Sequence, residues 1–130
     1  MNEPRWISRR GLLLLHTESL AQFGGLDGIR DENLLESALA RPKNRFLYDS
    51  DADLAAIAAA YGFGLVHNHP FHDGNKRTGF QSVGLFLLKN GQRLVAEQPD
   101  AIKMMLRLAT STLSEEEFAV WIRAHMKRRD

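Results

Sequence analysis

The side chains whose types and spacing could carry out chemistry are concentrated in one segment, HNHPFHDGNKRTG, from His67 to Gly79. It contains three histidines, an aspartate and two adjacent cations. Pro70 cannot continue a helix, and Gly74 can adopt backbone conformations that other residues avoid. The segment is therefore predicted to form a tight loop between two helices.

The residues that follow Gly74 have the character of an anion site. At a helix start the backbone amides of Asn75, Lys76 and Arg77 have no partner within the helix, and the helix dipole adds positive potential. Lys76 and Arg77 add charge. The acidic Asp73 beside them is explained if a divalent cation bridges its carboxylate to the same anion. Phosphate together with Mg²⁺ accounts for all of these residue types.

His69 and Phe71 complete the predicted loop. Histidine can take up a proton near neutral pH, so His69 could accept the proton of an attacking hydroxyl group. Phe71 has polar neighbours and is expected to insert into the core and fix the loop. A general base, a metal-binding carboxylate and a phosphate-binding turn together predict a site for phosphoryl or nucleotidyl transfer.

Two other interpretations of this segment stay open. In a metal-dependent phosphohydrolase the ligands would be His67, His69, His72 and Asp73. Pro70 disrupts the helical spacing that such ligands usually have, which argues against a hydrolase. The segment could also belong to a non-catalytic binding module, for example a repressor partner of an antitoxin.

Apolar spacing predicts the helices that must position this loop. Apolar residues from Leu54 to Leu65 recur on one helical face, so a helix beginning near Asp51 is expected to reach the histidines. A second helix is expected from about Asn75 to Leu88. Because it is apolar nearly all round from Gly79 to Leu88, it is predicted to be the central, buried helix.

Capping and breaking residues place the other helices. The pair Gly24-Gly25 ends a first helix, Asp31 caps a second that Pro42 ends, and Ser114 has capping-box spacing ahead of a last one. The run QRLVAE is at most one short strand. The predicted fold is all-α, a helical bundle around a central buried helix, with one small β-hairpin allowed.

Composition limits the remaining possibilities. A chain of 130 residues is expected to form one domain over residues 1–130. Its formal net charge of +1 gives no general attraction to nucleic acid or membranes, and neither is expected as a partner. It has no cysteine, which suits a reducing compartment, and its apolar N-terminal run is too short for a signal sequence. The sequence therefore predicts a cytoplasmic protein.

The segment HPFHDGNKRTG resembles the signature of the Fic/Doc superfamily, His-x-Phe-x-Asp-Gly or Ala-Asn. The variant with Asn-Lys-Arg is similar to the death-on-curing branch. The resemblance continues through GGLDGIRDENLLESALARP before the motif and LFLLKNGQRL after it, from about Ile7 to about Ile122. It implies a Fic fold for nearly the whole chain.

The resemblance also implies an activity. In this family the residue matching His69 is the catalytic base, the residue matching Asp73 holds Mg²⁺, and the turn matching 74–77 binds nucleotide phosphates. The founding branch is a toxin that uses ATP to phosphorylate a threonine of elongation factor Tu and thereby stops translation. A small antitoxin protein inhibits it by placing a disordered segment in a groove of the toxin.

Two departures from the wider family pattern bear on the reaction type. Lys76 stands where family members that transfer AMP have glycine, and Phe80 stands where they have a second arginine. The lysine would fill space used by the nucleotide α-phosphate, so a reversed nucleotide with its γ-phosphate toward His69 is expected. This favours a kinase, with AMP transfer by the same site as the alternative.

Regulation and target binding follow from two further comparisons with the family. Some members inhibit themselves through a run of Ser or Thr, three residues, Glu, then Gly or Asn, which this sequence lacks. Control by a separate antitoxin is therefore expected. The segment RPKNRFLYDS is predicted to lie between the second and third helices as a flap that aligns an extended target segment.

Overall fold

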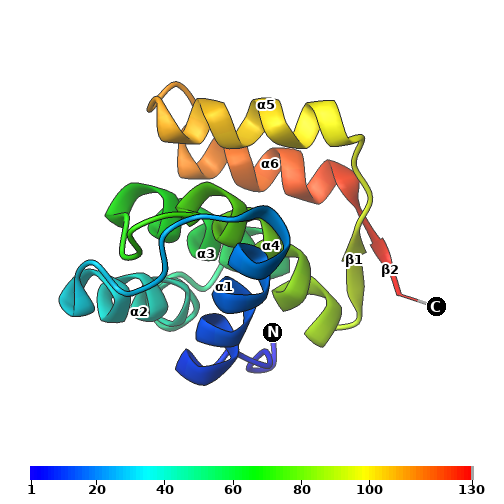
Figure 1. Cartoon of the computed structure of the whole chain (residues 1–130). Coiled ribbons are helices and arrows are strands. Elements are labelled where there is room, and N and C mark those ends of the chain that lie inside the picture. The colour runs from blue at the N-terminus through cyan, green and yellow to red at the C-terminus, as the bar shows by residue number, and fades with distance from the viewer. Residues whose placement is uncertain (130) are drawn as a thin grey trace.

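The structure is a computed structural model that describes residues 1–129. It confirms the all-α class, with helices forming nearly all of the regular structure (Figure 1). In chain order the elements are α1 (Arg9–Phe23), α2 (Glu32–Tyr48), α3 (Leu54–Asn68), α4 (Asn75–Lys89), β1 (Gln92–Leu94), α5 (Gln98–Ala109), α6 (Glu115–His125) and β2 (Met126–Arg128). Within these residues no helix combines the length and the apolar character needed to cross a membrane.

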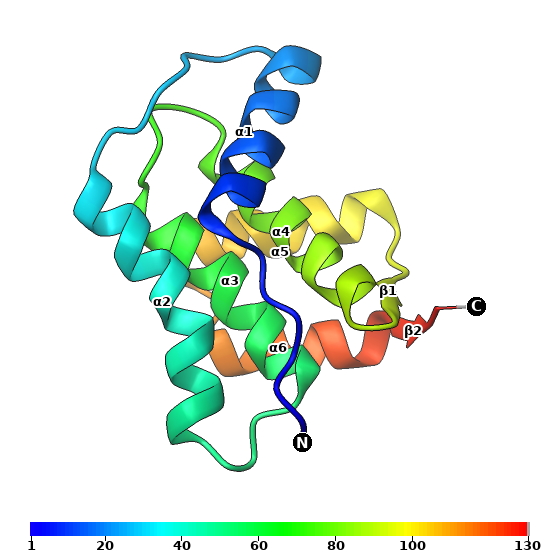
Figure 2. The ribbon, with the colours of Figure 1, turned by 90° about the horizontal axis from the view of Figure 1, so that it is seen from below.

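The central helix is α3, and the prediction that α4 occupies the centre was wrong. Every residue of α3 from Ala55 to Gly62 is buried, whereas Leu88 near the end of α4 is 42% exposed. Helices α2, α4, α5 and α6 all contact α3 (Figure 2). The alanines explain the difference, because small side chains let neighbouring helices approach α3 from several sides.

Glycines bring α3 and α4 close together near the loop that joins them. A Cβ atom on Gly62 would lie 3.0 Å from Val83 on α4, and it would also lie 2.9 Å from Phe118 on α6. A Cβ atom on Gly79 would lie 3.1 Å from Val66 and 3.3 Å from the carbonyl oxygen of Gly62. The two helices therefore form a rigid pair at the base of the loop, since interiors packed this tightly do not tolerate an added methyl group.

The segment predicted to be a flap is helical. Residues 43–48 continue α2 beyond Pro42, which is buried inside the helix. A proline in a helix interior costs about 3 kcal/mol, so other contacts must hold the later turns. Arg45 contributes, since it pairs with Glu115 at 2.9 Å and with Glu116 at 2.6 Å, both on α6. No local feature of residues 41–48 indicates this partner far along the chain.

The two strands form a small antiparallel sheet in which Gln92 pairs with Arg128 and Leu94 with Met126. The strands are separated by α5 and α6, so the sheet closes the C-terminal part of the chain onto the end of α4. It lies on the opposite side of the molecule from the loop between α3 and α4 (Figure 1).

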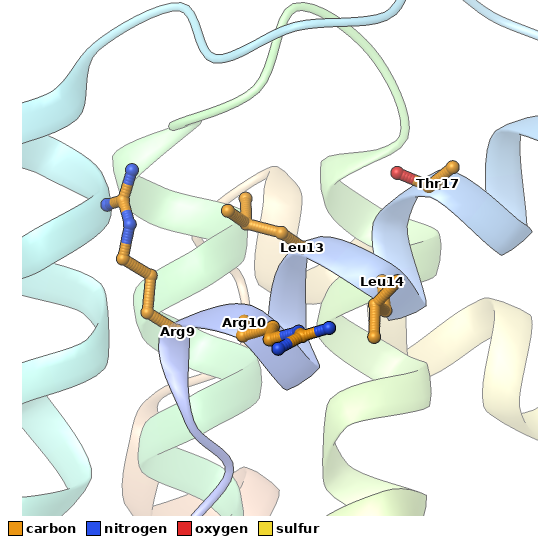
Figure 3. A pocket seen from close by; sticks show the side chains of 5 residues that line it. All are labelled: Arg9, Arg10, Leu13, Leu14 and Thr17. Carbon is orange, nitrogen blue, oxygen red and sulfur yellow. The ribbon is translucent and has the colours of Figure 1, made fainter.

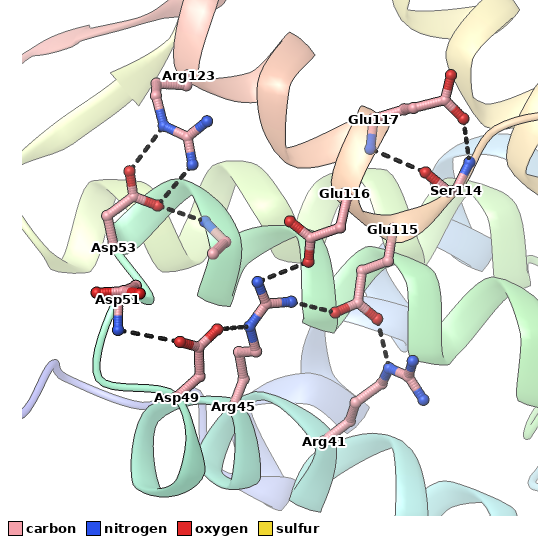
Figure 4. Close-up of polar contacts among 11 residues, drawn as sticks. Arg41, Arg45, Asp49, Asp51, Asp53, Ser114, Glu115, Glu116, Glu117 and Arg123 are labelled. Atoms are coloured by element: carbon pink, nitrogen blue, oxygen red, sulfur yellow. Dashed lines mark hydrogen bonds and ion pairs between the residues drawn. The ribbon is translucent and has the colours of Figure 1, made fainter.

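The N-terminus of α3 carries an ion pair that makes stability depend on pH. Asp53 caps the helix by accepting from Ala56 N at 2.9 Å, and its carboxylate bonds to Arg123 at 2.7 and 2.9 Å (Figure 4). The bonds from Arg123 are the main reason why the pKa of Asp53 lies below its usual 3.8. This contribution to stability is present above pH 3.8 and is lost as the pH falls through the lowered pKa.

We expect Asp53→Asn, which keeps the capping oxygen, to lower the free energy of unfolding at neutral pH by about 0.2–1 kcal/mol, since the pair is partly exposed. The difference from the unsubstituted protein should shrink below about pH 4. Urea titrations at several pH values measure it, with Asp51→Asn as the control at a neighbouring exposed carboxylate. A difference that persisted at pH 2 would contradict the assignment.

Candidate active site

The loop between α3 and α4, residues 69–74, is called the motif loop here. It begins with His69, which ends α3 in the left-handed region at φ 51° and ψ 52°. A non-glycine residue in this region is strained unless its surroundings hold it there. Arg30 supplies such contacts, because its guanidinium donates to the carbonyl oxygens of His69 at 2.7 Å and Asn68 at 3.0 Å.

The imidazole of His69 has a defined tautomer. Its Nδ1 lies 3.2 Å from the carbonyl oxygen of Val66. A carbonyl oxygen can only accept, so Nδ1 carries the proton and the neutral ring has its free electron pair on Nε2. The His69 side chain is exposed, and Nε2 has no partner among the described residues. The ring can therefore accept a proton from a bound hydroxyl group.

Phe71 and Asn75 fix the middle of the motif loop. Phe71, which was expected to anchor the loop, has no exposed surface. The side chain of Asn75 is buried and accepts from Phe71 N at 3.0 Å while donating to Phe71 O at 2.9 Å. Both polar atoms of Asn75 thus bond within the motif loop and the side chain is buried, so its backbone amide is the group available to bind a phosphate.

The N-terminus of α4 presents free amides. Gly74 precedes the helix with φ 81° and offers no side-chain cap, and the first helical bond runs from Thr78 N to Gly74 O. The amides at 75–77 have no acceptor among the described residues. Lys76 and Arg77 are exposed beside them, and the Arg77 guanidinium lies 4.1 Å from the ring centre of Phe23. These groups together form a cradle for an anion.

Asp73 lies beside this cradle. Its Oδ2 accepts from Leu26 N at 2.6 Å, and its Oδ1 has no partner among residues 1–129. No group of three or more His, Cys, Asp or Glu side chains in this range could hold a metal ion by itself. One free carboxylate oxygen next to a phosphate cradle fits Mg²⁺, which usually binds one or two carboxylates together with phosphates and water.

The linker between α1 and α2, residues 24–31, lies along the motif loop. Ile29 forms an isolated antiparallel bridge with Phe71, Gly28 O accepts from His72 N at 3.2 Å, and Arg30 N donates to Pro70 O at 2.7 Å. Both segments lie at the same end of the bundle (Figure 2). Residues 24–31 thus provide the main-chain pairing at this site. From the sequence, a flap from residues 41–50 was expected to lie there instead.

The chain is similar to a known protein family over most of its length. The family model described as the Fic/DOC family matches residues 6–87, which include α1, the linker, α2, α3, the motif loop and nearly all of α4. The chain belongs to this family.

Two curated relatives of this Fic/DOC chain bear the name Doc and place it in the death-on-curing branch. The protein kinase doc of Escherichia phage P1 is 33% identical over 119 residues, which cover 92% of this chain and 94% of the phage protein. The toxin Doc of Mycolicibacterium smegmatis is 43% identical over 77 residues, 58% of each chain.

Sequence reasoning missed three groups that hold the Fic/DOC motif in place. They are His16, Arg30 and the amide of Leu26. The glycine at position 25 is a sequence signal for the contact between this turn and the motif loop. Gly25 has φ 125°, and a Cβ atom there would lie 3.2 Å from the Cβ of Asp73. A glycine pair that follows a helix can thus indicate a close approach to another segment.

A hollow of about 280 Å³ on α1 is separate from the motif. It is lined by Arg9, Arg10, Leu13, Leu14 and Thr17 (Figure 3). Arg9 points toward α2, where its guanidinium pairs with Glu32 and Glu36. None of the lining residues belongs to the motif loop, so the hollow is not the phosphate site indicated by the sequence.

Proposed function

We propose that this chain is a death-on-curing toxin that transfers the γ-phosphate of ATP to a Ser or Thr hydroxyl of a translation protein in the cytoplasm, with elongation factor Tu as the expected target. One observation carries the proposal. Residues 69–77, the motif loop and the helix start that follows it, carry His69 Nε2, Asp73 Oδ1 and the first amides of α4, all without partners among residues 1–129. The name of the phage P1 relative, protein kinase doc, supports phosphate transfer.

Each group has a role in this reaction. His69 Nε2 would take the proton as the target hydroxyl oxygen bonds to the γ-phosphorus, while the bond to the bridging oxygen breaks and ADP leaves. The amides at 75–77 would bind phosphate oxygens, and Lys76 and Arg77 would stabilise the charge on the transferred group. Mg²⁺ held by Asp73 would neutralise further phosphate charge.

The residues at 76 and 80 support phosphate transfer over AMP transfer. Lys76 is exposed at the second position of α4, next to the free amides, so its side chain would occupy space that a glycine leaves open. Phe80 packs against the hydrophobic core and supplies no second cation. A nucleotide with its γ-phosphate toward His69 is compatible with both side chains.

We expect incubation of the protein with a bacterial lysate and Mg²⁺ to transfer label from γ-labelled ATP, and not from α-labelled ATP, to one protein. Mass spectrometry would identify the modified hydroxyl, and His69→Ala serves as the control for other kinases in the lysate. Label transferred from the α position would overturn the kinase proposal in favour of AMP transfer. Absence of label from both would contradict either reaction.

The proposal includes a partner. The relatives named Doc include a protein called a toxin, and this chain lacks the internal inhibitory run described above. A small antitoxin that binds the toxin in a groove through a segment that folds on binding is therefore the expected means of control.

A further inference from the structure

His16 lies on α1 beneath the motif loop and has no role in the reaction proposed above. It is 2% exposed, and its ring stacks on Phe71 with ring centres 3.7 Å apart and planes 9° apart. Its Nε2 lies 2.8 Å from the carbonyl oxygen of Asp73. Because a carbonyl oxygen only accepts, Nε2 carries a proton and donates it to this bond.

This hydrogen bond determines which way the peptide between Asp73 and Gly74 faces. The described residues contain no cis peptide bond, and in a trans peptide the C=O and N–H groups point in opposite directions. With the Asp73 carbonyl directed at the buried ring of His16, the N–H of Gly74 points away from it. No acceptor for this N–H is present among residues 1–129, so it extends the run of free amides at 75–77.

The opposite peptide orientation would be harmful to anion binding. Gly74 has no Cβ atom, so rotation of this peptide meets little steric resistance. After rotation the Asp73 carbonyl would present its partial negative charge where the N–H had been, and one donor would be lost. His16 opposes this rotation, because the carbonyl would leave a buried donor without a partner.

We propose that His16 is a positioning residue that holds the Gly74 N–H toward the phosphate of the bound nucleotide. The choice of a nucleotide phosphate rests on the proposed function. His16 does not touch the substrate in this proposal, and it acts only through the orientation of one peptide.

Two substitutions separate this role from packing. His16→Phe keeps a flat ring to stack on Phe71 but removes the donor. His16→Gln removes the ring but keeps an N–H donor at a similar distance from the backbone. Where His16→Phe does not fold, His16→Met takes its place as a buried side chain without a donor.

The readouts are ADP affinity, measured by calorimetry with and without Mg²⁺, and the NMR signals of the Gly74 amide and the Asp73 carbonyl without ligand. We expect His16→Phe to bind ADP about tenfold more weakly, with changed signals for this peptide. His16→Gln should bind within about threefold of the unsubstituted protein, even where its melting temperature is the lower of the two. If His16 acted only through packing, His16→Phe would bind ADP more tightly than His16→Gln.

Unchanged ADP affinity and unchanged peptide signals in His16→Phe would overturn the proposal, as would failure of folded His16→Gln to restore binding. The measurement is binding and not transfer. An unsubstituted protein that binds ADP but transfers no phosphate would contradict the proposed function and leave the role of His16 supported. A protein that binds neither ADP nor pyrophosphate would overturn both.

Discussion

His69→Ala should lower the rate of phosphate transfer by about 10²- to 10⁴-fold, because it removes the group proposed to accept the proton. The bond from His69 Nδ1 to the carbonyl oxygen of Val66 leaves Nε2 free for this role. The side chain is exposed and its replacement creates no cavity, so the melting temperature should stay close to that of the unsubstituted protein. In a bacterium expressing the variant, growth should continue where the unsubstituted chain arrests it.

His67→Ala is a matched control for this experiment. His67 is an exposed histidine on the last turn of α3, stacked on Phe63, and it has no place in the proposed reaction. Its removal should leave growth arrest intact. Asp73→Asn tests the metal-binding carboxylate in the same assay while keeping an acceptor for Leu26 N. Growth arrest by His69→Ala at normal expression would exclude His69 as the base.

Phe71→Ala should have the largest effect on stability, lowering the free energy of unfolding by about 3–5 kcal/mol. Phe71 is fully buried, stacks on His16, and has both backbone groups bonded to the side chain of Asn75. Its loss would leave a cavity beneath the motif loop. Chemical denaturation followed by circular dichroism measures the change.

The control for Phe71 is Phe23→Ala. Phe23 is 53% exposed at the end of α1, so its removal should change the free energy of unfolding by no more than about 0.5 kcal/mol. A Phe71→Ala protein within 1 kcal/mol of the unsubstituted chain would show that Phe71 does not anchor the loop.

Local features of the sequence were sufficient to predict most helix boundaries. Asp31 and Ser114 cap α2 and α6 as expected, and Gly24 ends α1, because these signals act within a few residues along the chain. The failures involve contacts between distant segments. The turns of α2 past Pro42 are stabilised by contacts that include the ion pairs of Arg45 with α6, and the central position of α3 depends on how several helices pack.

The difference between local signals and contacts of distant segments also applies to the candidate site. The motif loop could be located from its own residues, since Pro70 and Gly74 interrupt two helical patterns. The residues that hold the motif loop in place could not be predicted, because His16 contacts it from α1 and Arg30 contacts it from the linker at residues 24–31. A histidine on an apolar helix face has no local signature that distinguishes core packing from a hydrogen bond to a loop far along the chain.

The left-handed backbone of His69 gives this protein a trade-off between stability and activity at a single position. A residue with a side chain in this conformation is less stable than glycine by about 1–2 kcal/mol. Glycine would relieve that cost and would also remove the imidazole. The fold thus retains some conformational strain at the residue proposed to accept the proton. An inactive His69→Gly variant would be more stable than the unsubstituted protein and therefore better suited to purification and crystallisation.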